Sequence, residues 1–323
     1  MFEIIPLIIS LLIVLFLIPH FIKRMHFKKF LGTDMNKYNK PLIAELGGTI
    51  VFIGFTTGIF SAIFLATYLQ VFTIKLGYLL AGFSTIAIIA FVGFIDDIIG
   101  WKKGIRQWQH ALFPIIAALP LMAISIEKTT MTLPIIGLID FGIFYSLIII
   151  PIAITGASNA FNMLAGYNGL EAGQGILLTG TLTIIAFFTG QTTTMILGLA
   201  MIGALTGFLY YNWFPAKIFG GDSLTLMVGA NLAIMSILGN MQTFGIIIIV
   251  LFFIEFLIKA KHKFQSECFG LPQKNGLLKA NPKGGSITQF ILKKPMKEWQ
   301  VTTTILIIQG MICLIVLGIF FVL

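Results

Sequence analysis

The sequence predicts an all-α membrane protein with about ten transmembrane helices in a single domain. Of its 323 residues, 58% are hydrophobic and 10% are charged, and the mean hydropathy is +1.00. A soluble domain with a hydrated surface does not sustain such a composition. Apolar runs of about 20 residues, the length that crosses a bilayer, recur from one end of the chain to the other. They leave no room for a separate soluble core, so we predict one membrane domain over residues 1–323, with the lipid bilayer as its surroundings.

The apolar runs define the predicted helices in order along the chain. The first run has no basic segment before it and no small-residue cleavage site after it, so we expect it to be a span rather than a removed signal peptide. Helices are expected near residues 4–22, 46–68, 76–95, 108–126, 142–160, 172–189, 194–212, 222–240, 242–259 and 301–323.

The basic residues predict how these helices are oriented. An even number of spans places both termini on one side of the membrane and the odd-numbered loops on the other. All of the 21 Lys and Arg residues except Lys75 and Lys128 fall in the odd-numbered loops. By the positive-inside rule these loops are cytoplasmic and both termini are outside. The basic residues behind the net charge of +9 then set the orientation of the helices and contact anionic headgroups or phosphates. We expect no nucleic-acid partner.

Two loops are long enough to carry structure of their own. The segment 260–300 is the longest hydrophilic stretch, and its Gly, Pro and Lys content predicts an irregular cytoplasmic loop with short amphipathic pieces. The segment 127–141 on the opposite side predicts a small hairpin. Cys268 and Cys313 lie in a loop and in an apolar run, which indicates neither a disulfide framework nor a cysteine metal site.

Acidic residues are scarce, so their positions are informative. Asp96 and Asp97 follow a long apolar run in FVGFIDDIIG, at the predicted cytoplasmic boundary. A carboxylate inside the hydrocarbon costs about 2.5–3.5 kcal/mol on insertion scales, so the pair is expected at the interface or beside a hydrated cavity. The alternative is that the pair only makes the helix end soluble.

The loop after the fifth predicted helix reads GASNAFNMLAGYNGLEAGQ. It brings Asn159, Asn162, Asn168 and Glu171 together among glycines, which allow the backbone to approach a ligand closely. The alternative is a polar turn between two helices, because Gly and Asn both favour turns.

The loop after the seventh predicted helix reads NWFPAKIFGGDSLTL and places Asp222 at a helix start. Free amides at a helix N-terminus suit phosphate, and Asp222 could hold a cation there, although an ordinary N-cap is the alternative. Glu45 in AELGG and the run Lys261, His262 and Lys263 are expected on the same membrane face. Together these groups suit a magnesium ion and a pyrophosphate. GxxxxGK[ST] does not occur, which excludes a P-loop ATPase.

Three segments resemble the polyprenyl-phosphate N-acetylhexosamine-1-phosphate transferases: FIDD at 94–97, NAFNMLAGYNGLEAGQ at 159–174 and NWFPAKIFGGDSLTLMVG at 212–229. The resemblance covers nearly the whole chain. LAGYNGLEAGQ is more similar to the eukaryotic and archaeal GlcNAc branch than to the bacterial MurNAc branch, whose histidine-rich loop is absent. The resemblance implies transfer of N-acetylglucosamine 1-phosphate from UDP-GlcNAc to a polyprenyl or dolichyl phosphate, with release of UMP, as the first membrane step of glycan assembly.

The resemblance also implies roles for particular residues. Mg²⁺ is the implied cofactor, with Mn²⁺ as an alternative, and the paired acids are implied to position the lipid phosphate. Where the family has a phosphate-binding Lys in its fourth helix, either Arg106 or His110 stands here. The implied assignments are Asn162 and Asp222 for the metal, Asp96, Asp97 and Asp222 for catalysis, and Glu45, Arg106, His110, Asn159, Asn168, Glu171, Phe219, Lys261, His262 and Lys263 for the substrates.

Two other classes of protein would also have many transmembrane helices. A secondary transporter of a phosphorylated or anionic solute would also be a ten-helix bundle, but it needs a site at the membrane midplane, and no inverted repeat is evident. A non-catalytic scaffold leaves the crowded acids and amides without a purpose. We therefore expect an enzyme, in the plasma membrane of a prokaryote such as an archaeon, with its catalytic face cytoplasmic and a homodimer as an open option.

Overall fold

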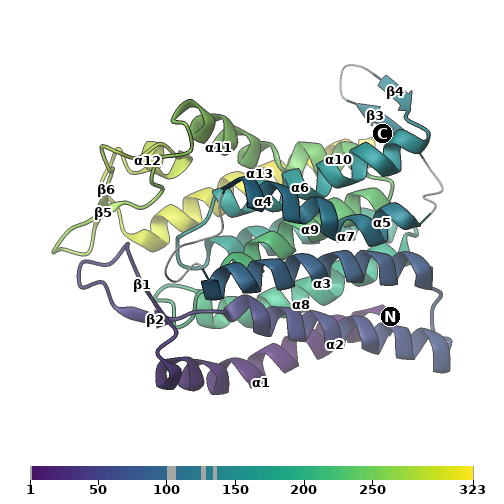
Figure 1. The fold of residues 1–323 in the computed structure, drawn as a ribbon, viewed down its shortest axis with the longest axis horizontal. Coiled ribbons are helices and arrows are strands. Elements are labelled where there is room, and N and C mark those ends of the chain that lie inside the picture. Colours follow the sequence, from purple (N-terminus) through teal and green to yellow (C-terminus); the bar gives the residue numbers. More distant parts are fainter. Residues whose placement is uncertain (1, 100–106, 125–128, 134–136, 323) are drawn as a thin grey trace.

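The chain folds as a bundle of long helices with small β-hairpins at its two ends (Figure 1). The computed structural model describes residues 2–99, 107–124, 129–133 and 137–322. The long helices run side by side, so the loops between them gather at the two ends of the bundle.

The helices follow the predicted apolar runs. A 3-10 turn, η1 (Phe2–Ile4), precedes α1, and a π-helical turn, η2 (Tyr145–Ile149), precedes α6. The α-helices are α1 (Ile5–Lys28), α2 (Gly47–Tyr68), α3 (Leu76–Ile99), α4 (Gln107–Ala117), α5 (Leu119–Ala123), α6 (Ile150–Met163), α7 (Leu170–Phe188), α8 (Thr192–Asn212), α9 (Asp222–Leu238), α10 (Gln242–Ile248), α11 (Val250–Lys261), α12 (Ile287–Ile291) and α13 (Glu298–Val322).

Three antiparallel strand pairs occur in the described loops. Strand β1 (Leu31–Thr33) pairs with β2 (Leu42–Ala44) after α1. Strand β3 (Thr130–Leu133) pairs with β4 (Gly137–Asp140), which confirms the hairpin predicted within 127–141. Strand β5 (Leu271–Pro272) pairs with β6 (Leu278–Lys279) within the hydrophilic stretch that was predicted to be irregular.

Helix α9 is the centre of the bundle. Every residue from Ser223 to Leu238 is buried, and the helix packs against α2, α3, α6, α7 and α8. A helix that is apolar on all sides belongs in a core rather than on a surface. The position of its first residue, Asp222, is therefore fixed by neighbours on every side.

Within the described ranges, seven helices are long and apolar enough to cross a membrane, and the pair α10 and α11, bent by 55°, can form an eighth span. The protein is thus a mostly helical multi-span membrane protein. The other two of the ten predicted spans correspond to shorter helices, α9 and the stretch Leu112–Ala123. Helix α9 is enclosed by other helices, so its length does not have to match the thickness of the hydrocarbon core. The stretch Leu112–Ala123 contains Pro114 and Pro120, which cannot donate the helical hydrogen bond.

The two ends of the bundle differ in what they carry. The start of α1, the end of α13 and the β3–β4 hairpin lie at one end, whereas β1–β2 and β5–β6 lie at the other (Figure 1). The start of α1 and the end of α13 thus share one end of the bundle, and the side of the membrane that this end faces stays a prediction.

The separation of the two ends predicts opposite accessibility for two surface positions. Leu138 lies in β4, and Lys274 lies in the turn between β5 and β6, and both side chains are exposed. In a background in which Cys268 and Cys313 are replaced by Ala, Leu138→Cys and Lys274→Cys should react with a membrane-impermeant maleimide from opposite sides, with Lys274→Cys reacting from the cytoplasm. Labelling of both positions from one side of sealed vesicles would contradict this topology.

Candidate active site

A polar cavity of about 270 Å³ lies where three loops meet, at the β1–β2 end of the bundle. The loops follow α1, α6 and α8 and bring together the segments that contain Glu45, Glu171 and Asp222, while Phe269 comes from the segment after α11. The cavity is lined by Thr33, Asp34, Met35, Glu45, Asn162, Ala165, Gly166, Tyr167, Asn168, Glu171, Asn212, Phe219, Gly220, Gly221, Asp222, Leu224, Thr225 and Phe269.

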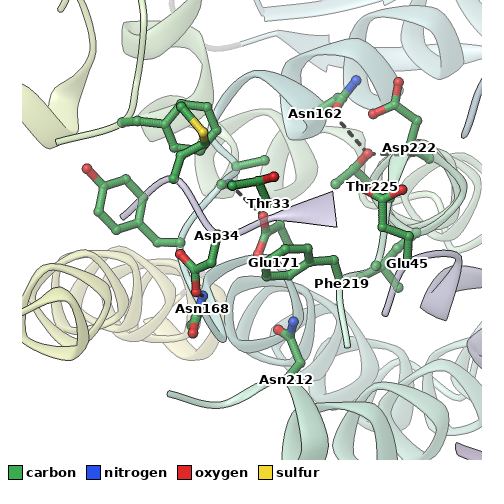
Figure 2. A pocket seen from close by; sticks show the side chains of 18 residues that line it. Thr33, Asp34, Glu45, Asn162, Asn168, Glu171, Asn212, Phe219, Asp222 and Thr225 are labelled. Atoms are coloured by element: carbon green, nitrogen blue, oxygen red, sulfur yellow. Dashed lines mark hydrogen bonds between the residues drawn. The ribbon is translucent and has the colours of Figure 1, made fainter. Parts of the chain in front are cut away.

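The polar side chains of this cavity form two groups. Figure 2 shows Asn162, Asp222 and Thr225 together on one side and Asp34 and Asn168 on the other. The hydroxyl of Thr225 donates to Oδ1 of Asn162 at 3.0 Å, which fixes the amide. The ring of a further lining residue, Phe219, is drawn between the two groups (Figure 2).

The start of α9 is held by a carboxylate from α3. Oδ1 of Asp97 accepts the backbone N–H of Asp222 at 2.6 Å. Oδ2 of Asp97 accepts both the N–H of Ser223 at 3.1 Å and its hydroxyl at 2.7 Å. The N-cap residue, Gly221, has no side chain to cap the helix. Asp97 therefore caps α9 from another helix, so it does more than make the end of α3 soluble. Asp222 is the first residue of α9 and not its N-cap.

Glycines bring the neighbouring helices close to this helix start. A Cβ atom on Gly93 of α3 would lie 2.6 Å from the N and Cα atoms of Ser223. A Cβ atom on Gly48 of α2 would lie 2.5 Å from the N atom of Leu224. Real Cβ atoms do not come so close, so these two contacts require glycine. The fold thus presses α2 and α3 against the backbone that carries Asp222.

Backbone hydrogen bonds place Glu45 and Phe219 beside each other. The N–H of Phe219 donates to the carbonyl of Ala44 at 2.8 Å, and the N–H of Gly47 donates to the carbonyl of Phe219 at 2.9 Å. Burial, and next the negative charge of Asp97, raise the pKa of Glu45. The carboxyl group of Glu45 therefore stays protonated to higher pH than an exposed one.

A buried network holds the loop around Asn168. Oδ1 of Asn168 accepts the N–H of Ala216 at 2.8 Å, and its Nδ2 donates to Asp34 Oδ2 at 3.3 Å. The N–H of Asn168 donates to Oε1 of Glu298, from α13, at 3.0 Å. Lys37 pairs with this same Glu298 and lies 3.2 Å from Asp34 Oδ2. Asn168 is thereby fixed as part of the cavity wall.

A second, mostly apolar cavity of about 910 Å³ adjoins the first. Both Asn162 and Asp222 line it as well, so the two cavities meet at these side chains. Its walls come mainly from α6 and α11, and Ile152 and Phe253 on these walls are more than half exposed at the molecular surface. An apolar channel that is open at its side suits a lipid chain.

The structure brings half of the predicted residues to these two cavities, Asn162 and Asp222 to both of them. Glu45, Asn168, Glu171 and Phe219 line the polar cavity, and Asn159 lines the apolar one. Asp96 is buried in α3 and, like Asp97, lines neither cavity. The catalytic role of this pair stays a prediction.

The predicted basic residues are placed differently. Lys261, His262 and Lys263 are exposed at the end of α11 and line neither cavity. Arg106 and the side chain of His110 lie outside the described residues.

Sequence reasoning missed several lining residues. Thr225 follows Asp222 by three positions on the same helix, a spacing that places both side chains on one face and could have indicated it. Asp34 and Lys259 carried no such signal: Asp34 lies in a loop rich in Lys, and Lys259 lies in the last turn of α11, and the basic residues of both segments were attributed to orientation.

The oxygen-rich cavity fits a small divalent cation. No group of three or more His, Cys, Asp or Glu side chains suited to a metal ion occurs among the described residues. Mg²⁺ does not require one, because it is usually held by one or two carboxylates together with water and substrate phosphates. Asp34, Glu45, Glu171 and Asp222 line the polar cavity without a Lys, Arg or His among its described lining residues. Burial raises the pKa of Glu45 and Glu171, and Lys37 pairs with Asp34. Asp222 is therefore the lining carboxylate with which a cation would offset the charge of a diphosphate.

Comparison with known proteins identifies the family. The model of "Glycosyl transferase family 4" matches residues 79–240, which include the two motif loops and α9. A protein of Saccharolobus solfataricus named "Putative UDP-N-acetylglucosamine--dolichyl-phosphate N-acetylglucosaminephosphotransferase" is 36% identical over 95% of this chain and 92% of its own length. A protein of the same name from Sulfolobus acidocaldarius is 34% identical over 87% and 84% of the two chains. The phospho-N-acetylmuramoyl-pentapeptide-transferase of Latilactobacillus sakei is 34% identical over 77% and 79%. The chain therefore belongs to glycosyl transferase family 4 and is a multi-span membrane phosphotransferase of that family.

Proposed function

We propose that this protein transfers N-acetylglucosamine 1-phosphate from UDP-GlcNAc to a polyprenyl phosphate of the dolichyl type and releases UMP. The observation that carries this proposal is the meeting of two cavities of opposite character at Asn162 and Asp222. A polar cavity suits the nucleotide sugar, an apolar one suits the lipid, and the shared side chains lie where the two substrates would react. This reaction would be the first membrane step of glycan assembly.

In the proposed complex the nucleotide sugar lies in the polar cavity with its uracil at one side and its diphosphate at the other. Phe219 offers a ring for the uracil to stack on, near the fixed amide of Asn168. The diphosphate then lies toward Asn162 and Asp222, where the two cavities meet. Asn162 and Asp222 would hold Mg²⁺, with Mn²⁺ as an alternative. When bound, such a cation neutralises charge on the phosphates and helps to orient them.

The chemistry needs positioning more than bond-forming groups from the protein. An oxygen of the polyprenyl phosphate attacks the sugar-bearing phosphorus of UDP-GlcNAc, and the bond between that phosphorus and the bridging oxygen of UMP breaks. One pyrophosphate is exchanged for another, so no further energy source is needed. Phosphoryl transfer of this kind is accelerated mainly by alignment and charge stabilisation. Asp97 contributes by fixing the helix start that carries Asp222.

The relatives support the choice of substrates. The two archaeal proteins carry a name that specifies UDP-GlcNAc and dolichyl phosphate, and they match over most of both chains. We also propose that the chain crosses the membrane ten times, that both termini lie outside the cell, and that the catalytic face points to the cytoplasm of a prokaryotic cell. A transporter is disfavoured because the polar lining residues gather at one end of the bundle rather than at its middle.

The direct test is UMP release by the purified protein with polyprenyl phosphate and Mg²⁺, across a panel that includes UDP-GlcNAc, UDP-GalNAc, UDP-glucose and UDP-MurNAc-pentapeptide. We expect UMP and a lipid-linked sugar diphosphate from UDP-GlcNAc above the others. Preference for the muramyl donor would overturn the substrate assignment, and absence of UMP with every donor would overturn the reaction.

Asp222→Asn should leave a folded protein that is nearly inactive. The amide keeps the shape of the side chain but removes the charge that would attract a cation, and electrostatic contacts of this kind are worth roughly 10²–10³ in rate. The measurement is kcat at saturating donor over a range of Mg²⁺ concentrations, with Glu267→Gln, an exposed carboxylate outside both cavities, as the matched control. Near-normal kcat at ordinary Mg²⁺ would remove Asp222 from the site.

Asp97→Asn should lower both kcat and thermal stability. One oxygen becomes an NH₂ group facing the donors at the start of α9, and an unsatisfied buried donor costs about 1–3 kcal/mol. We expect kcat to fall by roughly 10²-fold, as for other electrostatic contacts in catalysis. Ser223→Ala removes only one of the three hydrogen bonds and should have a smaller effect. Equal stability and activity of wild type and Asp97→Asn would show that this cap does not position the site.

A further inference from the structure

Lys259 is the cationic side chain of the apolar cavity among its described lining residues. It lies in the last turn of α11, and its side chain is 15% exposed. Its Nζ atom donates to the carbonyl oxygen of Met163, the last residue of α6 and the neighbour of Asn162. The ammonium group thus lies beside the place where the two cavities meet. A lysine in a mostly apolar wall is costly to desolvate, so its ammonium group needs acceptors and negative charge close by.

Glu255 keeps Lys259 at this place. It lies one turn earlier on α11, its side chain is fully buried, and its Oε1 is 3.8 Å from Nζ of Lys259. Its other oxygen, Oε2, accepts the N–H of Ile287 at the start of α12 at 2.8 Å. Because an ammonium has three N–H donors and 3.8 Å is beyond hydrogen-bond distance, Met163 takes one donor of Lys259 and leaves capacity for a further acceptor.

We propose that Lys259 binds the phosphate group of the polyprenyl phosphate while its hydrocarbon chain occupies the apolar cavity, and that Glu255 is the positioning residue for Lys259. The inference rests on the proposed function and names the group that recognises the acceptor. Among the described basic residues that follow Lys259 in the chain, Lys261, His262 and Lys263 are exposed and line neither cavity.

The simpler explanation is that Lys259 only neutralises the buried charge of Glu255. The two explanations differ in the variant that lacks both charges. If Lys259 serves only Glu255, the single variant Lys259→Gln leaves an unpaired buried carboxylate, and the added change Glu255→Gln removes the problem. If Lys259 binds phosphate, the double variant still lacks the cation and remains defective toward the lipid phosphate.

The experiment measures binding and turnover with the full-length protein in detergent or lipid nanodiscs. Binding of polyprenyl phosphate is compared with binding of the uncharged polyprenol, and KM is measured separately for polyprenyl phosphate and for UDP-GlcNAc. The variants are Lys259→Gln, Lys259→Arg and Lys259→Gln combined with Glu255→Gln. Lys274→Gln, an exposed lysine in the β5–β6 turn, is the matched control.

For Lys259→Gln we expect polyprenyl phosphate to bind at least about tenfold more weakly, as for loss of a hydrogen bond to a charged group. Polyprenol binding and the KM for UDP-GlcNAc should change less than about twofold, Lys259→Arg should recover most of the affinity, and the double variant should not. Recovery of polyprenyl phosphate binding in the double variant, or equal loss of polyprenol binding, would overturn the proposal.

The outcomes separate this inference from the proposed function. Wild-type protein that binds polyprenyl phosphate through Lys259 but releases no UMP from any donor would overturn the reaction and leave the inference in place. Wild-type protein that releases UMP with unchanged lipid affinity in Lys259→Gln would overturn the inference alone. Wild-type protein that binds polyprenyl phosphate no better than polyprenol would overturn both.

Discussion

The contact on which the site depends most is the carboxylate of Asp97 across the start of α9. The first N–H groups of a helix have no hydrogen-bond partner within the helix, and those of α9 lie inside a packed bundle. Asp97 accepts from Asp222 and Ser223, so the central helix begins at one defined place. Because α9 packs against the helices that surround it, fixing its first turn also fixes where the two cavities meet.

The hydrophilic segment after α11 is joined to this arrangement by a few shared acceptors. The carbonyl oxygen of Cys268 accepts from the hydroxyl of Tyr167 at 3.0 Å, the hydroxyl of Thr288 at 2.7 Å and the amide of Gln289 at 2.8 Å. Burial raises the pKa of Tyr167, so its hydroxyl keeps its proton and remains a donor. Asn36 adds a second link, since its amide bonds the carbonyl of Gly166 and the N–H of Gly270. The segment thus acts as a wall of the site rather than as a loose loop.

The sequence allowed the helices and the motif loops to be predicted because both depend on local signals. Apolar runs mark helices whatever their neighbours, and Gly and Asn clusters mark where the backbone turns. It could not show that α9 is enclosed by protein, since an apolar run does not distinguish lipid from a core. It also could not pair Lys37 with Glu298, which are far apart in the chain. Lys259 shows the same limit. Residues of a helix turn by about 100° each, so Lys259 and Lys261 point in different directions although they are close in sequence.

The two cavities handle negative charge in different ways, and this difference bears on how the substrates meet. Carboxylates line the polar cavity, so a nucleotide diphosphate is expected to enter it with a cation rather than alone. The apolar cavity has the fixed cation Lys259, held by a buried partner, so an anionic lipid headgroup needs no cation from solution. Each substrate can then bind without the other. A cation held by Asn162 and Asp222 would reduce the repulsion between the two phosphate groups on one side of the boundary, as Lys259 would on the other, and the attack would then depend mainly on alignment.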